Sequence, residues 1–344
     1  MLGEAFMIVL SGDIGGTSIR LQLTEFGSND EFTILKTIRY KNANYSSFND
    51  VIDAFMLEIG GYRQVIESAC FGVAGPIVNG VVQFTNLPWL IRVADIKAKL
   101  SLEKVKLIND FEAVGYGIEM LLPTDLETLQ KGKARDNGVR AFIGAGTGLG
   151  VGFMAYDERG KYFVYPTEGG HVDFAPTDDL QVELFKYLRK KYHRVSFERV
   201  LSGQGLVNIY HFVRDNKIFS EDENPSLRFL LEGSKDLDVA ATIAEYAIKH
   251  KDIMSMRALD MFIRIYGAAV GNLALSTLPY GGIYIVGGIA PKLLMQIKSG
   301  VFMEMYDDKG RMSHLLKDIP VHIVMNTDVG LCGAAVFARR ILEV

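Results

Sequence analysis

A strand, a glycine turn and a second strand follow one another twice in this chain of 344 residues. Residues 5–24 read AFMIVL, SGDIGGTS and IRLQLT, where the unbroken apolar run is typical of a buried strand and the alternation of a half-buried one. Residues 138–166 repeat this layout around GAGTGLG. Dinucleotide and Walker loops open a helix instead, so neither motif fits. The repeat predicts an α/β protein with two related halves.

Length and composition indicate a soluble globular protein of more than one domain. Hydrophobic residues make up 49% and the formal net charge is −4, so charge favours neither nucleic acid nor an anionic membrane as a partner. Two cysteines, Cys70 and Cys332, are too few for a zinc site and favour a reducing compartment. We find no basic leader and no run of about 18 apolar residues, and therefore expect a cytoplasmic enzyme.

The first glycine turn has the composition of a phosphate-binding loop. Its glycines let the backbone approach a ligand closely, with N–H groups turned towards an anion, and Thr17 adds a hydroxyl donor. Asp13 would repel phosphate unless a cation lay between them, which predicts Mg²⁺ held by Asp13 through water. The alternative is a tight hairpin whose glycines serve positive φ and whose aspartate bonds its own backbone. The residues concerned are Gly12, Asp13, Ile14, Gly15, Gly16 and Thr17.

Two further glycine turns favour the phosphate interpretation. GAGTGLG (144–150) has four glycines in seven residues, a density that costs conformational entropy and that close contact with phosphate would justify. VGGIAP (286–291) follows an apolar run and is expected to precede a helix, where its backbone would meet adenine or ribose. Three such turns predict a nucleotide site in a cleft between the halves. The residues expected to contact the nucleotide here are Gly146, Thr147, Gly148, Gly287 and Gly288.

A set of polar residues suits a ligand with many hydroxyl groups. Asp110 ends an apolar run at the entry of a predicted helix, and open α/β sheets bind ligands at such strand ends; its alternative role is a helix N-cap. His171 has no second His or Cys at metal-ligand spacing, and its alternative is a satisfied turn histidine. Planar side chains of this kind each satisfy one or two hydroxyls. The set is Asn86, Asn109, Asp110, Glu168, His171 and Glu198.

The motifs that carry these residues resemble those of bacterial ATP-dependent glucokinases of the proteobacterial type, in the actin-like, hexokinase-like ATPase superfamily. They are GDIGGTSIRL, NDFEAV, GAGTGLG, EGGHVDFAP, ERVLSGQGLVN and VGNLAL, in order along nearly the whole chain. The resemblance implies two actin-like (ribonuclease H-like) α/β domains flanking a cleft. The smaller would comprise residues 1–120 and 325–344, and the larger residues 121–324. Thr167 departs from the family pattern, since relatives often carry glycine there.

The resemblance also implies the reaction: ATP-dependent phosphorylation of D-glucose at the 6-hydroxyl, the first step of glycolysis. It makes Asp110 the general base and gives the other hydroxyls to Asn86, Asn109, Glu168, His171 and Glu198. It assigns residues 12–17 and 144–150 to the phosphates, and Gly287 and Gly288 to the adenosine. ATP and Mg²⁺ are the implied cofactors, glucose the substrate and a homodimer the assembly.

Three alternatives stay open. A hexose or hexosamine kinase of broader specificity, as in the ROK family, usually carries a cysteine-rich zinc motif after the histidine, where this chain has VDFAP. A sugar-responsive repressor on the same core would need a helix-turn-helix before the first strand, which is expected to begin near residue 6. A non-catalytic or hydrolytic actin-like ATPase would not need the sugar-type polar set. Selectivity between sugar epimers depends on pocket shape, which the sequence does not give.

Overall fold

The chain folds into two compact units. The computed structural model describes residues 6–27, 31–84, 89–216, 223–233 and 237–343. Unit 1 comprises Met1–Asp125, Asp157–Pro166 and Asn326–Val344, and unit 2 comprises Leu126–Tyr156 and Thr167–Met325. The expected boundaries put residues 157–166 in the larger domain. They lie in unit 1 instead, because β11 (Tyr162–Pro166) packs against α3 (Asp110–Gly117) and the Tyr162 carbonyl accepts a hydrogen bond from Arg340.

Unit 1 is built on a five-stranded sheet in the order β3-β2-β1-β4-β7. β1 pairs antiparallel with β2 and parallel with β4, and β7 continues the sheet in parallel. The predicted hairpin is confirmed, with Ile14 opposite Ile19 across the turn. The strands are β1 (Met7–Ile14), β2 (Ser18–Phe26), β3 (Phe32–Lys41), β4 (Ile66–Val73) and β7 (Val105–Asn109), and a separate pair is β5 (Val81–Gln83) with β6 (Leu90–Arg92).

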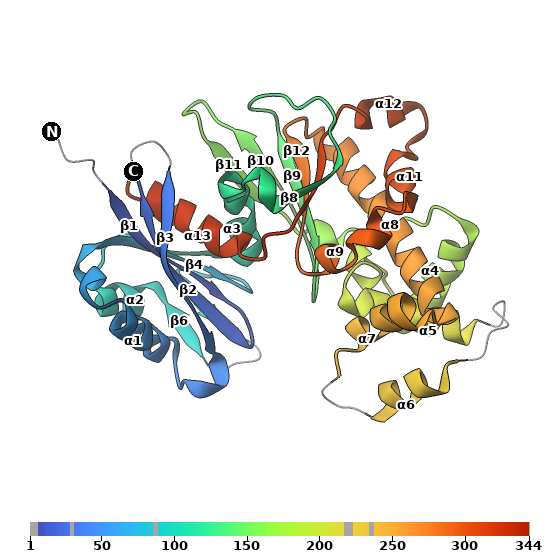
Figure 1. Ribbon diagram of the computed structural model, residues 1–344, viewed down its shortest axis with the longest axis horizontal. Helices are drawn as coiled ribbons and strands as arrows, with labels where there is room; N and C mark the ends of the chain where they lie inside the picture. Colours follow the sequence, from blue (N-terminus) through green and yellow to red (C-terminus); the bar gives the residue numbers. More distant parts are fainter. Residues whose placement is uncertain (1–5, 28–30, 85–88, 217–222, 234–236, 344) are drawn as a thin grey trace. The chain divides into compact units, whose positions relative to one another are not determined.

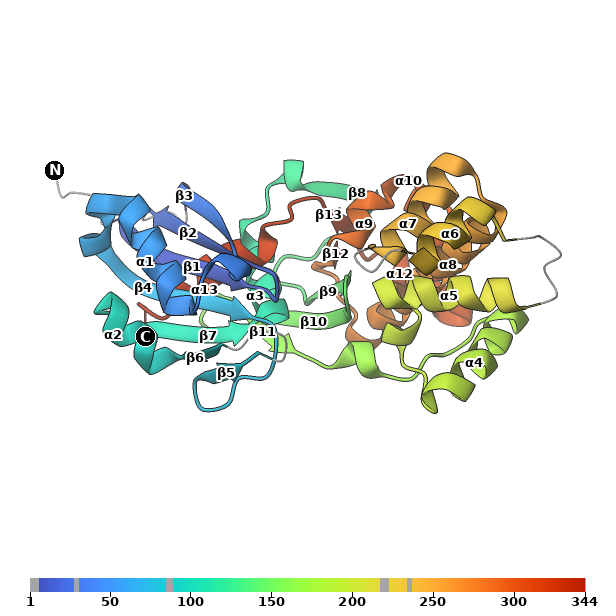
Figure 2. The same cartoon turned by 90° about the horizontal axis from the view of Figure 1, so that it is seen from below.

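Helices cover both faces of the unit 1 sheet (Figures 1 and 2). On one face lie α1 (Phe48–Ile59) and α2 (Val93–Leu100), whose Phe55 and Ile96 share a core cluster with Leu10 of β1. On the other face α3 packs against α13 (Val329–Arg340), which also contacts β1 and β4. The last helix of the chain therefore completes a core that its first strands begin.

Unit 2 repeats the topology of unit 1. Its strands belong to a six-stranded sheet in the order β11-β10-β9-β12-β13-β8. β9 pairs antiparallel with β10 and parallel with β12, as β1 does with β2 and β4. The predicted repeat of a glycine-turn hairpin is thus confirmed, and each hairpin is continued by parallel strands. The strands are β8 (Leu126–Gln130), β9 (Arg140–Ala145), β10 (Leu149–Tyr156), β12 (Gly282–Val286) and β13 (Val321–Val324).

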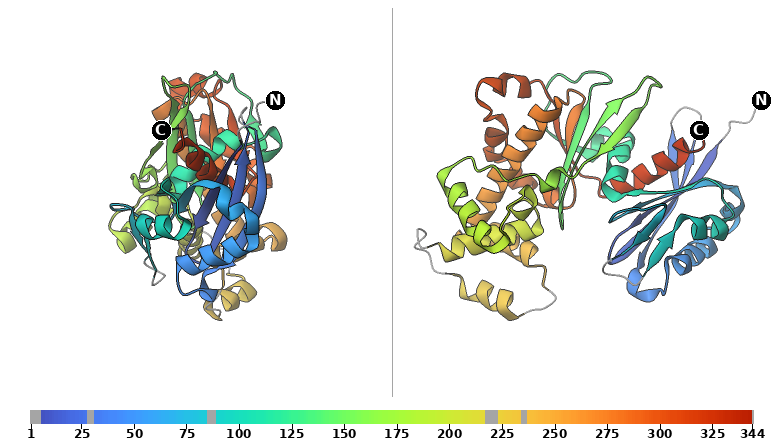
Figure 3. Two further views of the ribbon diagram at one scale, coloured as in Figure 1. Left: turned by 90° about the vertical axis from the view of Figure 1, so that its left-hand side faces the viewer. Right: turned by 180° about the vertical axis from the view of Figure 1, so that it is seen from behind.

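Helices make up most of the rest of unit 2. In Figure 3, α8 runs along the sheet with α11 beside it, and the two pack closely. The helices are α4 (Asp179–Tyr192), α5 (Gly203–Asp215), α6 (Pro225–Gly233), α7 (Val239–Glu245), α8 (Ile253–Thr277), α9 (Ile289–Lys292), α10 (Leu294–Ile297), α11 (Val301–Asp307) and α12 (Ser313–Leu316). The helix predicted to follow VGGIAP begins earlier, within the motif, as α9 at Ile289.

Helix α8 corrects one expectation from the sequence. Its length and apolar composition would suffice to cross a membrane, whereas we expected no such stretch. However, 72% of its most apolar window is buried inside the structure, with Phe262 and Tyr266 fully covered. Its apolar residues therefore form protein core. Within the described residues, no other helix is long and apolar enough to span a membrane.

Candidate active site

The first glycine turn, residues 15–17, connects β1 to β2 in unit 1. It is closed by the Gly15 N–H, which donates to the Ser18 carbonyl oxygen at 3.1 Å. Neither Gly12, Gly15 nor Gly16 lies in the left-handed region of φ, so positive φ does not explain the glycines. A Cβ on Gly16 would meet no atom within 4 Å. Space for a ligand is therefore open at this residue.

Asp13 at the end of β1 forms an ion pair with Arg20 of β2. The guanidinium donates to Asp13 Oδ2 through Nη2 at 2.6 Å and Nε at 3.2 Å, and it also pairs with Asp328 before α13. Mg²⁺ is usually held by one or two carboxylates together with phosphate oxygens and water. Asp13 offers one such carboxylate, since its side chain is 30% exposed and both bonds from Arg20 reach Oδ2. Among the described residues no group of three or more His, Cys, Asp or Glu side chains could hold a metal.

Asn109 and Asp110 lie where β7 passes into α3. The Asn109 side chain caps the helix, because its Oδ1 accepts hydrogen bonds from the N–H groups of Phe111 at 2.9 Å and Glu112 at 3.2 Å. The alternative in which Asp110 is the N-cap is therefore wrong, and Asp110 is the first residue of the helix. Its carboxylate accepts from Phe111 N at 2.8 Å.

Asp110 lies close to the first hairpin across β4. A Cβ on Gly72 would be 3.6 Å from the Asp110 Cα and 3.7 Å from the Gly12 carbonyl oxygen, so both segments flank this glycine. Burial raises the pKa of Asp110, and the negative charge of Asp13 raises it further. The carboxylate of Asp110 therefore takes up a proton more readily than that of a solvent-exposed aspartate.

The second glycine turn, residues 146–148, connects β9 to β10 in unit 2. Glu198, in the short 3₁₀ turn Phe197–Arg199, accepts a hydrogen bond from the Leu149 N–H at 3.0 Å through Oε2. A Cβ on Gly148 would lie 2.6 Å from the same oxygen. One of the residues predicted to bind sugar therefore supports the predicted phosphate turn directly.

Glu168 and His171 reach the same place from another segment. Glu168 precedes the 3₁₀ turn Gly169–His171, and His171 ends it. A Cβ on Gly170 would lie 2.0 Å from the Leu149 carbonyl oxygen, so this turn packs on the start of β10. Both side chains are exposed, with Glu168 Oε2 3.9 Å from His171 Nε2. The side chain of Glu198 and the backbone of the turn that carries Glu168 and His171 thus both lie beside Leu149.

The departure from the family pattern at Thr167 has a structural role. Its hydroxyl donates to the Val151 carbonyl oxygen at 2.7 Å and accepts from the Gly169 N–H at 3.0 Å. Arg194 supports the far side of the turn by donating to the His171 carbonyl oxygen at 2.7 Å. These bonds fix the backbone on either side of Glu168.

A pocket of about 610 Å³ opens beside the second glycine turn. The turn contributes Gly146 and Thr147, and the start of α9 contributes Gly288, so the structure brings two of the predicted nucleotide turns together. A Cβ on Gly146 or Gly288 would meet no atom within 4 Å. The other lining residues come from α5, α7 and α9 and are mostly apolar: Gly203, Gln204, Leu206, Val207, Leu237, Asp238, Val239, Ala240, Ala241, Ala244, Ile289, Lys292 and Leu293.

Sequence reasoning missed most of this lining. Gly203 belongs to the SGQG segment of the family motif, and the Gly203 N–H donates to the Gly146 carbonyl oxygen at 2.8 Å. The two glycines of that segment could therefore have indicated a close contact with the second glycine turn. Nothing in the sequence marks α7 or Lys292 as neighbours of a turn 90 or more residues away. Gly287 lies next to the pocket in the left-handed region, with φ +86°. Asn86 lies outside the described residues.

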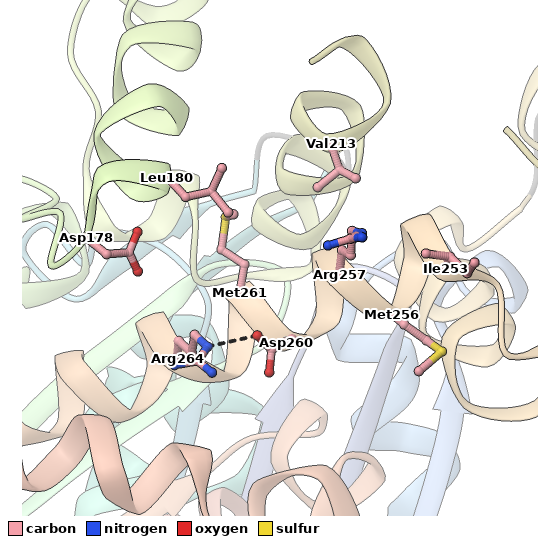
Figure 4. Close-up of a pocket in the computed structure, with 9 residues that line it drawn as sticks. All are labelled: Asp178, Leu180, Val213, Ile253, Met256, Arg257, Asp260, Met261 and Arg264. Carbon is pink, nitrogen blue, oxygen red and sulfur yellow. Dashed lines mark hydrogen bonds and ion pairs between the residues drawn. The ribbon is translucent and has the colours of Figure 1, made fainter. Parts of the chain in front are cut away.

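A second pocket, of about 490 Å³, lies elsewhere in unit 2. Figure 4 shows it between α8 and the residues Leu180 of α4 and Val213 of α5, with Arg264 donating to Asp260 at 2.8 Å along α8. None of the residues predicted to bind sugar or nucleotide lines it. The predicted residues instead form two sets, one in each unit.

A protein-family model described as Glucokinase matches residues 10–341. The chain belongs to the glucokinase family. Glucokinases from Nostoc sp. and Pectobacterium atrosepticum are 43% and 36% identical to it, each over 97% of this chain and over 99% and 98% of their own lengths. The family resemblance read from the sequence motifs is thereby confirmed. As a member of the glucokinase family, the chain is an enzyme of the sugar-kinase class.

Solved structures agree with the family assignment. The glucokinase of an Antarctic psychrotroph superposes with a TM-score of 0.85 at 29% identity, covering 98% of this chain and all of that one. A ROK family glucokinase from Streptomyces griseus, solved in complex with glucose and AMPPNP, shares the fold at a TM-score of 0.58 and 21% identity, covering 97% and 99%. The predicted fold class, a pair of actin-like α/β domains, is confirmed.

Proposed function

We propose that the protein transfers the γ-phosphoryl group of ATP to the 6-hydroxyl of D-glucose. The observation that carries this proposal concerns the glycine turn suited to phosphate. Glu198 bonds that turn at Leu149, and the segment that carries Glu168 and His171 packs there; all three residues are suited to sugar hydroxyls. A hydrolytic ATPase would not need the sugar-type residues there. The names of the family members, and the glucose-bound glucokinase of Balamuthia mandrillaris among the structures of this fold, support glucose as the sugar.

The nucleotide is proposed to occupy the pocket of unit 2. Apolar side chains from α5, α7 and α9 suit the adenine ring, and Lys292 supplies a positive charge for a phosphate. The first turn of α5, a helix of 13 residues, adjoins the glycine turn, and the N-terminus of a helix favours negative charge. Gly146 and Gly288 leave the backbone open to close approach.

Asp110 is proposed to act as the general base. Its carboxylate accepts the proton of the sugar 6-hydroxyl while that oxygen forms a bond to the γ-phosphorus and the bond from the γ-phosphorus to the ADP oxygen breaks. One well-placed base of this kind contributes roughly 10²–10⁴ in rate. Asn109, whose Oδ1 caps α3 and whose amide N–H also bonds the Asp110 carboxylate, is proposed as a ligand of another sugar hydroxyl. Asn86 is proposed as a further ligand.

Asp13 is proposed to hold Mg²⁺ through water. The ion would neutralise charge on the transferred phosphoryl group and on ADP. Arg20 keeps the Asp13 carboxylate in place, since both of its bonds reach the same oxygen, Oδ2. Gly12, Ile14, Gly15, Gly16 and Thr17 are proposed to contact the phosphates of ATP through the first turn.

We propose that unit 1 is the smaller domain of this family and unit 2 the larger. We also propose that the protein works in the cytoplasm. As the family resemblance implies, it is proposed to be a homodimer that supplies glucose 6-phosphate to glycolysis. Sedimentation of the purified protein would measure the assembly directly. A monomer at micromolar concentration would contradict the dimer.

The proposed reaction is tested by measuring ADP release over a panel of hexoses with ATP, ADP or polyphosphate as the donor. We expect release to depend on glucose and ATP. Similar rates with mannose or an N-acetylated hexosamine would favour the alternative, a kinase of broader hexose or hexosamine specificity. Release that is no faster with any hexose than without one would contradict the kinase function.

A further inference from the structure

A buried asparagine after β3 holds the first glycine turn. The Asn42 side chain donates to the Gly15 carbonyl oxygen through Nδ2 at 2.9 Å, and the Asn42 backbone N–H donates to the Thr17 carbonyl oxygen at 3.1 Å. The residue is 3% exposed and begins the 3₁₀ turn Asn42–Asn44. Two of the three turn residues are thus tied to one residue that lies 27 positions beyond Gly15.

These bonds set the direction of N–H groups in the turn. A carbonyl and the N–H of the next residue share one planar trans peptide and point in opposite directions. Because Asn42 holds the Gly15 carbonyl, the Gly16 N–H is directed away from Asn42. Gly16 is exposed, and a Cβ on it would meet no atom within 4 Å, so an anion can approach this residue.

One atom of the Asn42 side chain lowers the stability of the fold, so stability alone does not account for an asparagine at this position. Asn42 Oδ1 is buried and has no hydrogen-bond partner, and such an unsatisfied acceptor destabilises a folded protein. A leucine would fill similar space without that defect. What the amide supplies and a leucine cannot is the hydrogen bond to Gly15.

We propose that Asn42 is a positioning residue that orients the Gly16 N–H towards the phosphates of ATP. The inference rests on the proposed kinase function, because it assigns a ligand to the turn. Arg39 supports the end of the same turn, since it donates to Ser18 Oγ through Nη2 at 3.1 Å and Nε at 3.2 Å. The first turn is therefore fixed in place before a nucleotide arrives.

The test compares Asn42→Leu with Asn44→Leu, an exposed neighbour in the same 3₁₀ turn. We expect Asn42→Leu to raise the KM for ATP about tenfold, the effect of losing one oriented hydrogen bond to a charged group, with the KM for glucose unchanged. Its Tm should stay close to that of the parent, since loss of the bond to Gly15 is offset by removal of a buried unsatisfied oxygen. Asn44→Leu should leave all three values unchanged. A folded Asn42→Leu protein with the parental KM for ATP would overturn the proposal.

Hydrogen exchange provides a readout that needs no turnover. In the parent protein, ATP should slow amide exchange in residues 14–18, and in Asn42→Leu the free protein should exchange faster there and lose the protection. If Asn42→Leu does not fold, Asn42→Ser is measured in its place with the same expectation. Failure of hexose-dependent ADP release in the parent would contradict the kinase function. Amide exchange in residues 14–18 that is unchanged in Asn42→Leu, or in Asn42→Ser where that variant is used instead, would contradict the role of Asn42.

Discussion

The two glycine turns have the same topology but are held by different chemistry. In unit 1 the turn is held by a neutral amide, Asn42, and the neighbouring Asp13 by a guanidinium. In unit 2 the turn is held by the carboxylate of Glu198 at Leu149 and by the Gly203 N–H at the start of α5. A repeated hairpin therefore does not imply a repeated way of supporting it.

The difference has a functional consequence. The residues that support the first turn are separate from the proposed sugar ligands, whereas Glu198 is both a support for the second turn and a proposed sugar ligand. Damage to the first turn should thus affect ATP alone, and damage to the second should affect ATP and sugar together. The variants below test this separation.

The largest effect is expected from Asp110→Asn, which removes the proposed base beside the first turn. We expect kcat to fall by about 10²–10⁴ while ATP still binds, because the asparagine keeps the shape but accepts no proton. The rate comes from the coupled assay and the binding from calorimetry. Glu103→Gln, a 97% exposed acid of unit 1, is the control. Near-normal turnover would remove Asp110 from this role.

The same variant should be more stable than the parent at neutral pH. Burial raises the pKa of Asp110 in the folded protein above its unfolded value, so its contribution to stability is present at low pH and is lost as the pH rises through the folded pKa. A neutral side chain avoids that loss. Thermal melts at pH 4 and pH 7 measure it, and a lower Tm for Asp110→Asn at pH 7 would contradict the assigned cause.

Gly148→Ala should damage both substrate sites. The new Cβ would lie 2.6 Å from Glu198 Oε2, so the carboxylate must leave Leu149. We expect the KM values for glucose and ATP each to rise about tenfold, as the loss of one hydrogen bond to a charged group predicts. Gly16→Ala is the matched change in the first turn. Because its Cβ meets no protein atom, Tm should not change and only the KM for ATP should rise.

The pH dependence of kcat/KM should change when the ion pair between Arg20 and Asp13 beside the first turn is broken. A general base must be deprotonated, so the raised pKa of Asp110 places the acid limb of kcat/KM above the pH typical of an exposed aspartate. Arg20→Gln leaves the charge of Asp13 unpaired, which should move that limb to higher pH, and Arg20→Lys should restore it in part. Identical pH profiles for parent and Arg20→Gln would show that Asp13 does not act on Asp110.

The smallest effect is expected at the turn that carries Glu168. Thr167→Ala removes the hydroxyl that bonds Val151 and Gly169, and a loss of about 1 kcal/mol corresponds to a rise of roughly fivefold in the KM for glucose. Thr167→Ser should restore the parental value. A rise in the KM for ATP of the same size would mean that this turn and the nucleotide pocket are not separable.

Local patterns in the sequence predicted the parts of the site that depend on neighbouring residues. The apolar run before each glycine turn and the alternation after it predicted both hairpins, and the apolar run before Asn109 predicted the strand that ends there. These features depend on periods of two and on turn residues, which are visible within about ten positions. The family motifs then identified the chemistry that such turns serve.

Contacts between distant segments could not be predicted in this way. Glu198 reaches Leu149 across 49 positions, Asn42 reaches Gly15 across 27, and α7 joins the pocket from a stretch with no motif. The sequence offered Asp110 as a possible N-cap of α3, whereas Asn109 is the cap; both residue types are good caps, and only the folded backbone shows which side chain accepts the bonds. Tertiary packing decides each of these points.

The place of α13 in unit 1 has a consequence for synthesis of the protein. The helix that covers β1 and β4 consists of residues near the end of the chain, and its preceding Asp328 binds Arg20 in the first hairpin. During translation the first strands leave the ribosome long before their covering helix exists, while unit 2 becomes complete at residue 325. The unit whose residues are made first is therefore the one that can finish folding last.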